Sequence, residues 1–360
     1  MEKAKNRGTV LVFAILLLGG MLLHLLLPDQ EISRSERRRL AQAPEASGEA
    51  LLSGQYAQDL EDYLLDQFPG RESLRTLKAV WTYYMLGQQD NNGVYLSQGT
   101  AAKLDSELDP AQVQRFVDKM NEIHELYLSD STVYCAVIPD KNYYLDCPKL
   151  DYAALFETVE TGLPWASHID LTGSLTLEDY YATDSHWRQE RLDRVVSTLS
   201  QSMNLDLPSL ETYDRQTLSG FRGVYYGQSA LPLPPEDLVY LENDATQAAV
   251  VTGPELKGEQ TVYDPARFAG LDGYDVFLHG AQAVLTLENP LAETDRELIA
   301  FRDSYGSSLT PLLLSGYKTV TLVDIRYVSA ANLGKFVDFH GQDVLLLYST
   351  TVINSAGILR

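Results

Sequence analysis

Residues 297–348 read ELIAFRDSYGSSLTPLLLSGYKTVTLVDIRYVSAANLGKFVDFHGQDVLLLY, and this stretch decides the fold class. Its apolar and β-branched runs predict three strands, over 297–302, 319–325 and 343–348. Helix-like segments separate them, at 305–315 and 328–337. Strands that alternate with short helices favour a parallel sheet with right-handed crossovers. The stretch therefore predicts an α/β fold with a mostly parallel central sheet.

The sequence upstream extends this pattern more loosely. Apolar residues at helical spacing predict helices over 55–86, 110–128 and 188–203, the first broken at Phe68-Pro69-Gly70. Short apolar runs predict strands over 93–96, 132–139 and 274–278. Residues 204–270 are rich in Pro, Gly, Ser and Tyr, and we expect an irregular insertion with short strands there.

The N-terminal region contains an uncharged apolar segment, Thr9 to Leu27. As a helix it would span roughly 28 Å, about the thickness of the hydrocarbon core of a bilayer. We predict a cytoplasmic tail over 1–8, a transmembrane anchor over 9–27, a linker over 28–50 and an extracytoplasmic domain over 51–360. A cleaved signal peptide and a buried helix are the alternatives, although the segment is long for a signal peptide. Basic residues flank both ends, so the positive-inside count does not decide the orientation.

Charge is unevenly distributed along the chain. The 360 residues carry 28 Lys and Arg against 50 Asp and Glu, a net charge of −22. Residues 1–40 hold seven basic and four acidic side chains, so residues 41–360 carry a net −25. This balance argues against a partner that is duplex nucleic acid, because such binders need Lys and Arg to displace counterions from phosphates. It also disfavours other polyanions as ligands.

The chain has two cysteines, Cys135 and Cys147, twelve positions apart. A disulfide between them would fit an oxidising compartment. Two ordinary thiols fit the sequence equally well, and the spacing leaves both alternatives open.

Two short motifs contain residues suited to nucleophilic catalysis. Thr183-Asp184-Ser185-His186-Trp187 precedes a predicted helix, and Arg302-Asp303-Ser304-Tyr305-Gly306-Ser307 follows a predicted strand. Serine needs an imidazole to take its proton, and the imidazole needs a carboxylate to fix its tautomer. His186 and Asp184 could supply this pair for Ser304, and backbone N–H groups at the helix start could stabilise an oxyanion.

Spacing alone leaves other interpretations open. Asp-x-His is a common pattern, and Asp-Ser before a helix is ordinary N-capping. A metal site is a further alternative, because His168 and Asp170 form a second pair that could join Asp184 and His186 around zinc. No established zinc-ligand spacing supports that alternative, and we expect neither a metal nor another cofactor.

The first motif, with Tyr181 and Thr183 before it, resembles the name-giving motif of the DHHW protein family. That family is related to the SGNH-hydrolase-like alginate O-acetyltransferases AlgJ and AlgX. Further matches follow in family order: Asp66-Gln67-Phe68-Pro69-Gly70-Arg71, Asn92-Gly93-Val94-Tyr95, Pro139-Asp140-Lys141, Arg302-Asp303-Ser304-Tyr305, Pro311 and Val323-Asp324-Ile325-Arg326-Tyr327. The resemblance covers roughly residues 30–350. The sequence departs at Ser185, where the family name expects His.

The resemblance implies an SGNH-hydrolase-like three-layer fold outside the cytoplasmic membrane. It also implies an acyltransferase or esterase, with acetyl the expected acyl group and a cell-surface polysaccharide the expected substrate. The family's triad maps onto Asp184, His186 and Ser304, and a multipass membrane acyltransferase is the implied partner that supplies acyl groups. The resemblance does not assign an oxyanion hole.

Other residues near these motifs are weaker candidates. Asp324, Arg326 and Lys141 are predicted to bind substrate, whereas a structural ion pair and a solvated lysine are the alternatives. The competing function is a catalytically degenerate surface protein that binds glycans or acts as a scaffold. Separations of more than about 10 Å between the three triad residues would favour it, because triad partners must reach hydrogen-bond range.

Overall fold

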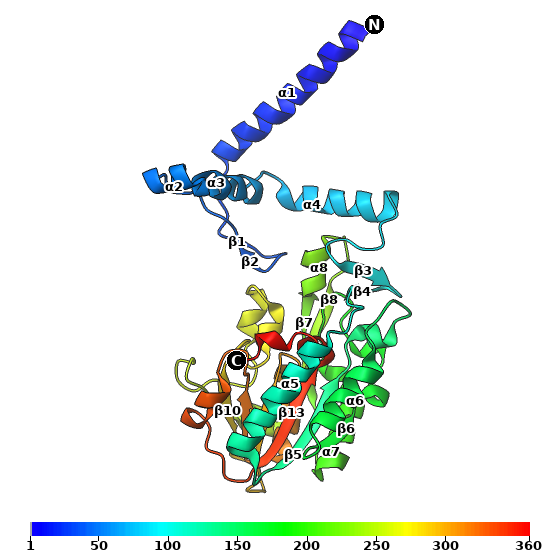
Figure 1. Cartoon of the computed structure of the whole chain (residues 1–360), viewed down its shortest axis with the longest axis vertical. Coiled ribbons are helices and arrows are strands. Elements are labelled where there is room, and N and C mark those ends of the chain that lie inside the picture. Colours follow the sequence, from blue (N-terminus) through cyan, green and yellow to red (C-terminus); the bar gives the residue numbers. More distant parts are fainter. Residues whose placement is uncertain (1) are drawn as a thin grey trace. The chain divides into compact units, whose positions relative to one another are not determined.

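The computed structural model describes residues 2–360, which divide into two compact units (Figure 1). The first unit runs to Asn92 and also includes Tyr226–Pro232. The second unit comprises Gly93–Tyr225 and Leu233–Arg360. The boundaries predicted at residues 8, 27 and 50 stay predictions.

The first unit consists of helices and one short hairpin. Its elements are α1 (Glu2–Leu26), β1 (Ile32–Ser33), β2 (Arg38–Arg39), α2 (Gly48–Ser53), α3 (Gln55–Asp66), α4 (Arg71–Val80) and the π-helical turn η1 (Trp81–Met85). The predicted break lies between α3 and α4, where Gly70 adopts a left-handed conformation with φ of 73°. Within α1, residues Asn6–Leu26 form a helix that is long and apolar enough to cross a membrane, a test that a signal sequence also passes.

The second unit is built on a seven-stranded sheet of order β6-β5-β13-β11-β12-β10-β9. Neighbouring strands from β6 to β12 pair in parallel, and β10 pairs antiparallel with β12 and β9. The sheet strands are β5 (Thr132–Ile138), β6 (Ser167–Asp170), β9 (Val250–Thr252), β10 (Val284–Glu288), β11 (Glu297–Arg302), β12 (Thr319–Val323) and β13 (Asp343–Ser349). The prediction of a mostly parallel central sheet is confirmed.

Both faces of the sheet are buried. Along β11, Leu298 and Ala300 pack in one apolar cluster, and Ile299 and Phe301 pack in another. One cluster includes residues of α5 (Pro110–Ile123) and α6 (Tyr152–Gly162), and the other includes residues of α7 (Asp193–Met203) and α10 (Gly306–Leu313). Because strands buried on both faces need apolar side chains at every position, they read as continuous hydrophobic runs. The unit is therefore a three-layer α/β/α fold, in which α5 and α6 cover one face (Figure 1).

Smaller elements complete the second unit, apart from α8, which begins in it and ends in the first unit. They are β3 (Val94–Ser97) paired with β4 (Thr100–Lys103), β7 (Asp214–Phe221) paired with β8 (Glu236–Glu242), α8 (Val224–Ser229), α9 (Asp244–Ala248) and α11 (Thr350–Ile353). The predicted irregular insertion over 204–270 thus contains a hairpin and two short helices.

The strand predicted over Tyr274–Leu278 is wrong. Residues Gly273–Val276 form a 3₁₀ turn, η9, whose start is capped by the side chain of Asp272. Leu278 and His279 then adopt φ of 51° and 63°, which a strand does not allow. The strand of this region is instead β10, which the sequence analysis missed along with β6. The helix predicted over 328–337 is a short 3₁₀ segment, η11 (Ala330–Lys335).

The parallel strands bring four polar positions to one edge of the sheet. Asp140 follows β5, Ser304 follows β11, Asp324 follows β12 and Ser349 ends β13. Because these strands are parallel neighbours, their carboxyl ends lie side by side, which is where open α/β sheets bind ligands.

Asp324 forms the buried centre of an ion cluster at this edge. It is 0% exposed, and Arg326 donates to its two oxygens at 2.9 and 2.6 Å. Nη1 of Arg302, itself 1% exposed, lies 3.6 Å from Oδ2. Burial lowers the pKa of Arg302 from its ordinary value. The structural ion pair considered for Asp324 and Arg326 is therefore present, and its atoms are engaged with one another.

We expect Asp324→Asn to destabilise the chain by about 3–5 kcal/mol, because it leaves the buried guanidinium of Arg302 and the half-buried one of Arg326 without their carboxylate. Urea unfolding of the detergent-solubilised chain, followed by circular dichroism, measures this loss. Asp295→Asn is the matched control, since Asp295 is 93% exposed in its pair with Lys318. Equal unfolding midpoints for the two variants would contradict the role given to the cluster.

Candidate active site

Ser304 lies in a turn that the buried Asp303 holds in place. Oδ1 of Asp303 accepts a hydrogen bond from the Tyr305 N–H at 3.0 Å, and Oδ2 accepts one from the Ser349 N–H at 2.8 Å. The first bond fixes the turn into α10, and the second ties it to the end of β13. Ser304 itself is partly exposed. Asp303 thus positions the serine at the edge of the sheet.

The Asp184–His186 segment is held in a closed loop. Tyr180 and Trp187 form an antiparallel bridge, and the Tyr181 N–H donates to the His186 carbonyl at 3.1 Å. Trp187 is wholly buried, and its Nε1 donates to Ser308 Oγ of α10 at 2.9 Å. The tryptophan therefore joins the loop to the helix that begins just after Ser304.

His186 lies between Asp184 and Ser304. Its Nδ1 is 2.6 Å from Asp184 Oδ1, and its Nε2 is 2.7 Å from Ser304 Oγ. Asp184 is 0% exposed and His186 9%. The structure thus brings together the three residues that the resemblance mapped as a triad, with every link at hydrogen-bond distance.

Asp184 is stabilised by backbone donors as well as by the imidazole. The Val224 N–H donates to Oδ2 at 2.7 Å, and the His186 N–H donates to Oδ1 at 3.1 Å. A buried carboxylate is costly unless it is hydrogen-bonded. With an ionised carboxylate on Nδ1, that nitrogen carries the proton, which leaves Nε2 free to accept the proton of Ser304.

The imidazole ring is held between aromatic side chains. Tyr274 stacks on His186 with centroids 3.9 Å apart and planes 10° apart, and Tyr305 lies 5.1 Å away. The Tyr274 hydroxyl donates to Ser308 Oγ at 2.7 Å. Burial raises the pKa of Tyr274 well above its ordinary value, so the phenol stays protonated. Sequence reasoning missed Tyr274, which it assigned to a strand.

Glu236 anchors the motif from the far strand of a hairpin. Its carboxylate accepts hydrogen bonds from the N–H groups of Ala182 and Thr183, at 2.8 and 2.7 Å, and pairs with Arg188 at 2.5 Å. No sequence signal links Glu236 to the motif, because about fifty residues separate them. The carboxylate fixes both ends of the loop that carries Asp184 and His186.

Lys141 does not have the exposure that the predicted substrate contact requires. It is 2% exposed, and its ammonium donates to Thr100 Oγ1, the Ala101 carbonyl and the Tyr181 carbonyl at 2.6 to 3.1 Å. Burial lowers its pKa to about 7, against an opposing effect of the nearby Asp184. Lys141 is therefore a structural residue that ties the β3–β4 hairpin to the start of the motif loop.

Gly223 allows the chain to approach the motif closely. Its N–H donates to Thr183 Oγ1 at 2.9 Å, and an added Cβ would collide with the Thr183 carbonyl and the Asp184 Cβ. Only glycine fits at this position without moving Asp184.

The Ser304 N–H is a candidate oxyanion donor. It takes part in none of the hydrogen bonds found among residues 2–360, although the neighbouring N–H groups of Tyr305 and Gly306 both bond to Asp303. A donor on the nucleophile itself lies within reach of the oxygen that would become negative during acyl transfer.

The residues proposed for an alternative metal site do not join the triad. His168 Nε2 lies 3.0 Å from the Leu163 carbonyl, and Asp170 accepts from the N–H and hydroxyl of Thr172. Over residues 2–360, no group of three or more His, Cys, Asp and Glu side chains is arranged to hold a metal ion. Cys135 and Cys147 are free thiols, and burial raises the pKa of Cys135 to about 12.

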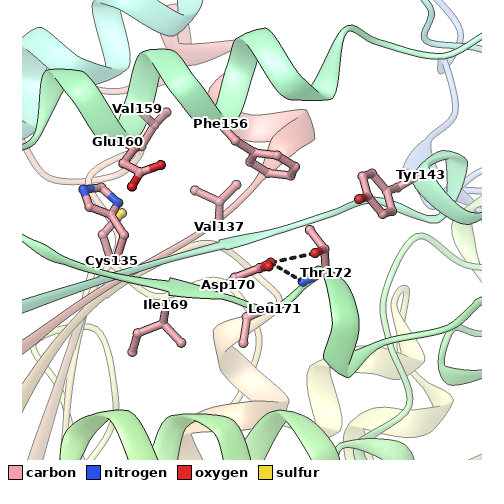
Figure 2. Close-up of a pocket in the computed structure, with 11 residues that line it drawn as sticks. Cys135, Val137, Tyr143, Phe156, Val159, Glu160, Ile169, Asp170, Leu171 and Thr172 are labelled. Carbon is pink, nitrogen blue, oxygen red and sulfur yellow. Dashed lines mark hydrogen bonds between the residues drawn. The ribbon is translucent and has the colours of Figure 1, made fainter.

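A cavity of about 320 Å³ lies apart from the triad residues, between α6 and the strands β5 and β6 (Figure 2). Phe156 and Val159 of α6 line one side, and Val137 of β5 lines the other. The cavity includes neither Ser304 nor His186 among its lining residues. Its size alone does not make it the active site.

No known family profile matches the chain, and no curated protein does. Solved structures do match. A DHHW family protein from Eubacterium siraeum superposes with a TM-score of 0.62 at 21% identity, over 75% of this chain and 95% of that chain. The chain has the fold of a DHHW family protein. The resemblance predicted from the motifs is thereby confirmed at the level of the fold.

Two further structures are similar. Bacillus cereus PatB1 with a sulfonyl adduct matches at a TM-score of 0.56 and 14% identity, over 72% of this chain and 94% of that chain. The O-acetyltransferase domain of Pseudomonas putida AlgJ is more distant, at a TM-score of 0.43 and 12% identity, over 73% and 92%. At these identities the Eubacterium siraeum and PatB1 matches establish the fold alone.

We expect Gly223→Ala to destabilise the chain by about 1–3 kcal/mol through overpacking. Because the new Cβ displaces Asp184, activity should fall about 10²-fold. Thermal unfolding and turnover of an activated acetyl ester measure the two effects. Gly173→Ala is the control, since Gly173 is exposed and an added Cβ there meets no atom within 4 Å. Equal activity of both variants would show that Gly223 does not position Asp184.

The free energy of unfolding should rise with pH above about 7. In the folded state Lys141 loses its proton near pH 7, because burial lowers its pKa to about 7, whereas in the unfolded chain the same lysine keeps its proton up to about pH 10.4. The slope is at most about 1.4 kcal/mol per pH unit. Urea unfolding at several pH values below about 8.5, before cysteines ionise, measures it. Lys141→Met should remove the slope, and a slope that persists in this variant would assign it to another group.

Proposed function

We propose that the chain is a membrane-anchored, extracytoplasmic enzyme that transfers or hydrolyses an acyl group, most simply acetyl, on a cell-surface polysaccharide. The observation that carries this proposal is the unbroken line of hydrogen bonds from Asp184 through His186 to Ser304. The two hydrogen bonds, of 2.6 and 2.7 Å, do not favour the alternative of a catalytically degenerate scaffold, because binding a glycan does not require an aligned triad.

The chemistry takes place in two balanced steps. Ser304 Oγ attacks the carbonyl carbon of the acyl donor while its proton passes to His186 Nε2. The tetrahedral adduct collapses, the bond to the leaving group breaks, and His186 returns the proton to that group. A glycan hydroxyl, or water, then loses its proton to His186 and attacks the carbonyl carbon of the acyl-Ser304. The bond between the acyl group and Ser304 Oγ breaks, His186 returns the proton to Oγ, and the acylated glycan, or the free acid when water attacks, leaves.

The supporting groups act when charge develops. Asp184 stabilises the imidazolium that forms on His186, and the N–H groups of His186 and Val224 hold its carboxylate in place. The Ser304 N–H supplies one donor to the oxyanion. Removing a single such donor in serine hydrolases costs about 10²–10³ in rate, so this contribution is substantial.

The proposed location and partners rest on helix α1 and on the net charge of residues 41–360. The apolar helix α1 serves as the anchor, and a multipass membrane acyltransferase is the proposed source of acyl groups. The net −25 of residues 41–360 favours neutral or amino-sugar acceptors over polyuronates, because anionic chains would be repelled.

Ser304→Ala should lower turnover of an activated acetyl ester by at least about 10³-fold, since loss of the nucleophile removes the covalent step. Ser307→Ala is the matched control, because Ser307 lies one turn further along and has no contact with His186 among the bonds described. A folded Ser304→Ala chain with wild-type turnover would refute the mechanism.

The same assay distinguishes transfer from hydrolysis and tests the acceptor. The purified chain is incubated with the acetyl ester and one of two acceptors. One is a neutral or amino-sugar oligosaccharide and the other is an oligouronate. The products are identified by mass spectrometry. Acetylated neutral or amino sugar is the expected product. A phenylmethylsulfonyl fluoride adduct on the Ser304 peptide would add support, since PatB1 has been solved with a sulfonyl adduct.

A further inference from the structure

The segment that follows the α3–α4 break carries an exposed apolar stripe. Leu74, Leu77, Trp81, Tyr84 and Met85 lie along α4 and η1 and define the apolar stripe. Their exposed fractions run from 48% to 66%. Residues three and four apart share a helix face, so the stripe is continuous over three turns.

The opposite face of α4 is the packed one. Arg71 and Arg75 pair with Glu36 of the β1–β2 connection at 2.5 and 3.3 Å, and Arg75 also donates to the Gly227 carbonyl at 2.8 Å. Ala79 on this side is fully buried. A surface helix of a soluble protein turns its apolar face inward, and α4 does the reverse. The ion pairs therefore fix the helix with its apolar stripe outward.

The start of α4 is held next to the end of α1. His24 Nδ1 lies 3.2 Å from the Gln67 carbonyl, and its ring packs edge-on against Tyr63 at 5.2 Å. A Cβ at Gly20 would lie 3.5 Å from the Phe68 ring. These contacts lie in the last two turns of α1 and at the α3–α4 break. If α1 crosses a bilayer, the break lies where α1 leaves the hydrocarbon core.

We infer that the apolar stripe binds the interface of the same bilayer that α1 crosses, as a second membrane contact that lies along the surface. This inference rests on the proposed membrane anchoring. Trp and Tyr at the interface and Leu and Met below it are the side chains that interfacial helices insert, to a depth of about 5–10 Å. Exposed Lys78 on the flank can reach lipid phosphates.

The occupant is lipid rather than a protein, because the bilayer that α1 is proposed to cross lies next to the apolar stripe. The stripe begins only four residues after Gly70, and the contacts of His24 and Phe68 keep that point against α1. Any protein that covered the stripe would have to displace lipid already present there.

The test uses the full chain, purified and reconstituted alone into phosphatidylcholine nanodiscs. The lipids are brominated either near the headgroup end or near the tail end of the acyl chains, and tryptophan fluorescence is recorded. Of the three tryptophans, Trp187 is wholly buried and Trp165 lies in the other unit, so Trp81 should provide the quenched signal. We expect quenching that is stronger with bromine near the headgroup and that Trp81→Phe abolishes.

Leu77→Asp should reduce the quenching of Trp81, because it places a charge in the apolar stripe. Leu126→Asp is the matched control, since Leu126 is 54% exposed in the second unit and lies outside the stripe. Equal quenching in wild type and Trp81→Phe, with the chain still in the nanodisc, would overturn the inference and leave α1 as the sole anchor. A chain that does not co-elute with nanodiscs would overturn the anchor and the inference together, whereas Ser304-dependent turnover would be unaffected.

Discussion

The buried Asp184 carboxylate is the constraint on which the site depends. A wholly buried charge needs several donors, and the fold supplies the His186 ring and the N–H groups of His186 and Val224. To bring these donors together, the motif loop must be closed and the 223–224 segment must pass directly against it. Glu236 meets the first requirement and Gly223 the second.

The parallel sheet provides the other half of the site. Its apolar strands are buried on both faces, so polar side chains are excluded from the layers and collect in the turns at the carboxyl edge. Ser304 is fixed there by Asp303, which bonds across to β13. The serine thus lies in a turn that is bonded to the sheet, and the histidine reaches it from a loop that Trp187 joins to α10.

Much of this arrangement could be predicted from the sequence, for identifiable reasons. Strands β11 and β13 could be predicted because continuous burial leaves continuous apolar runs. Strand β12 could be predicted because its residues are mostly β-branched. The grouping of Asp184, His186 and Ser304 came from motif order along the chain, since the spacing of Asp184 and His186 alone fits many folds. Tyr274 and Glu236 could not be found, because their contacts with the motif are tertiary and carry no local pattern. The burial of Lys141 could not be predicted, because a lysine is normally solvated and only the structure shows three acceptors around its ammonium.

Capture of the acyl-enzyme tests the central claim most directly. The chain is mixed with an activated acetyl ester, quenched in acid within a single turnover, digested and analysed by tandem mass spectrometry. The account predicts one acetyl group on Ser304 in the wild-type chain, with none at that position when His186 is replaced by Asn. Turnover that proceeds with acetyl on another residue, or with Ser304 unmodified at every time point, would contradict it.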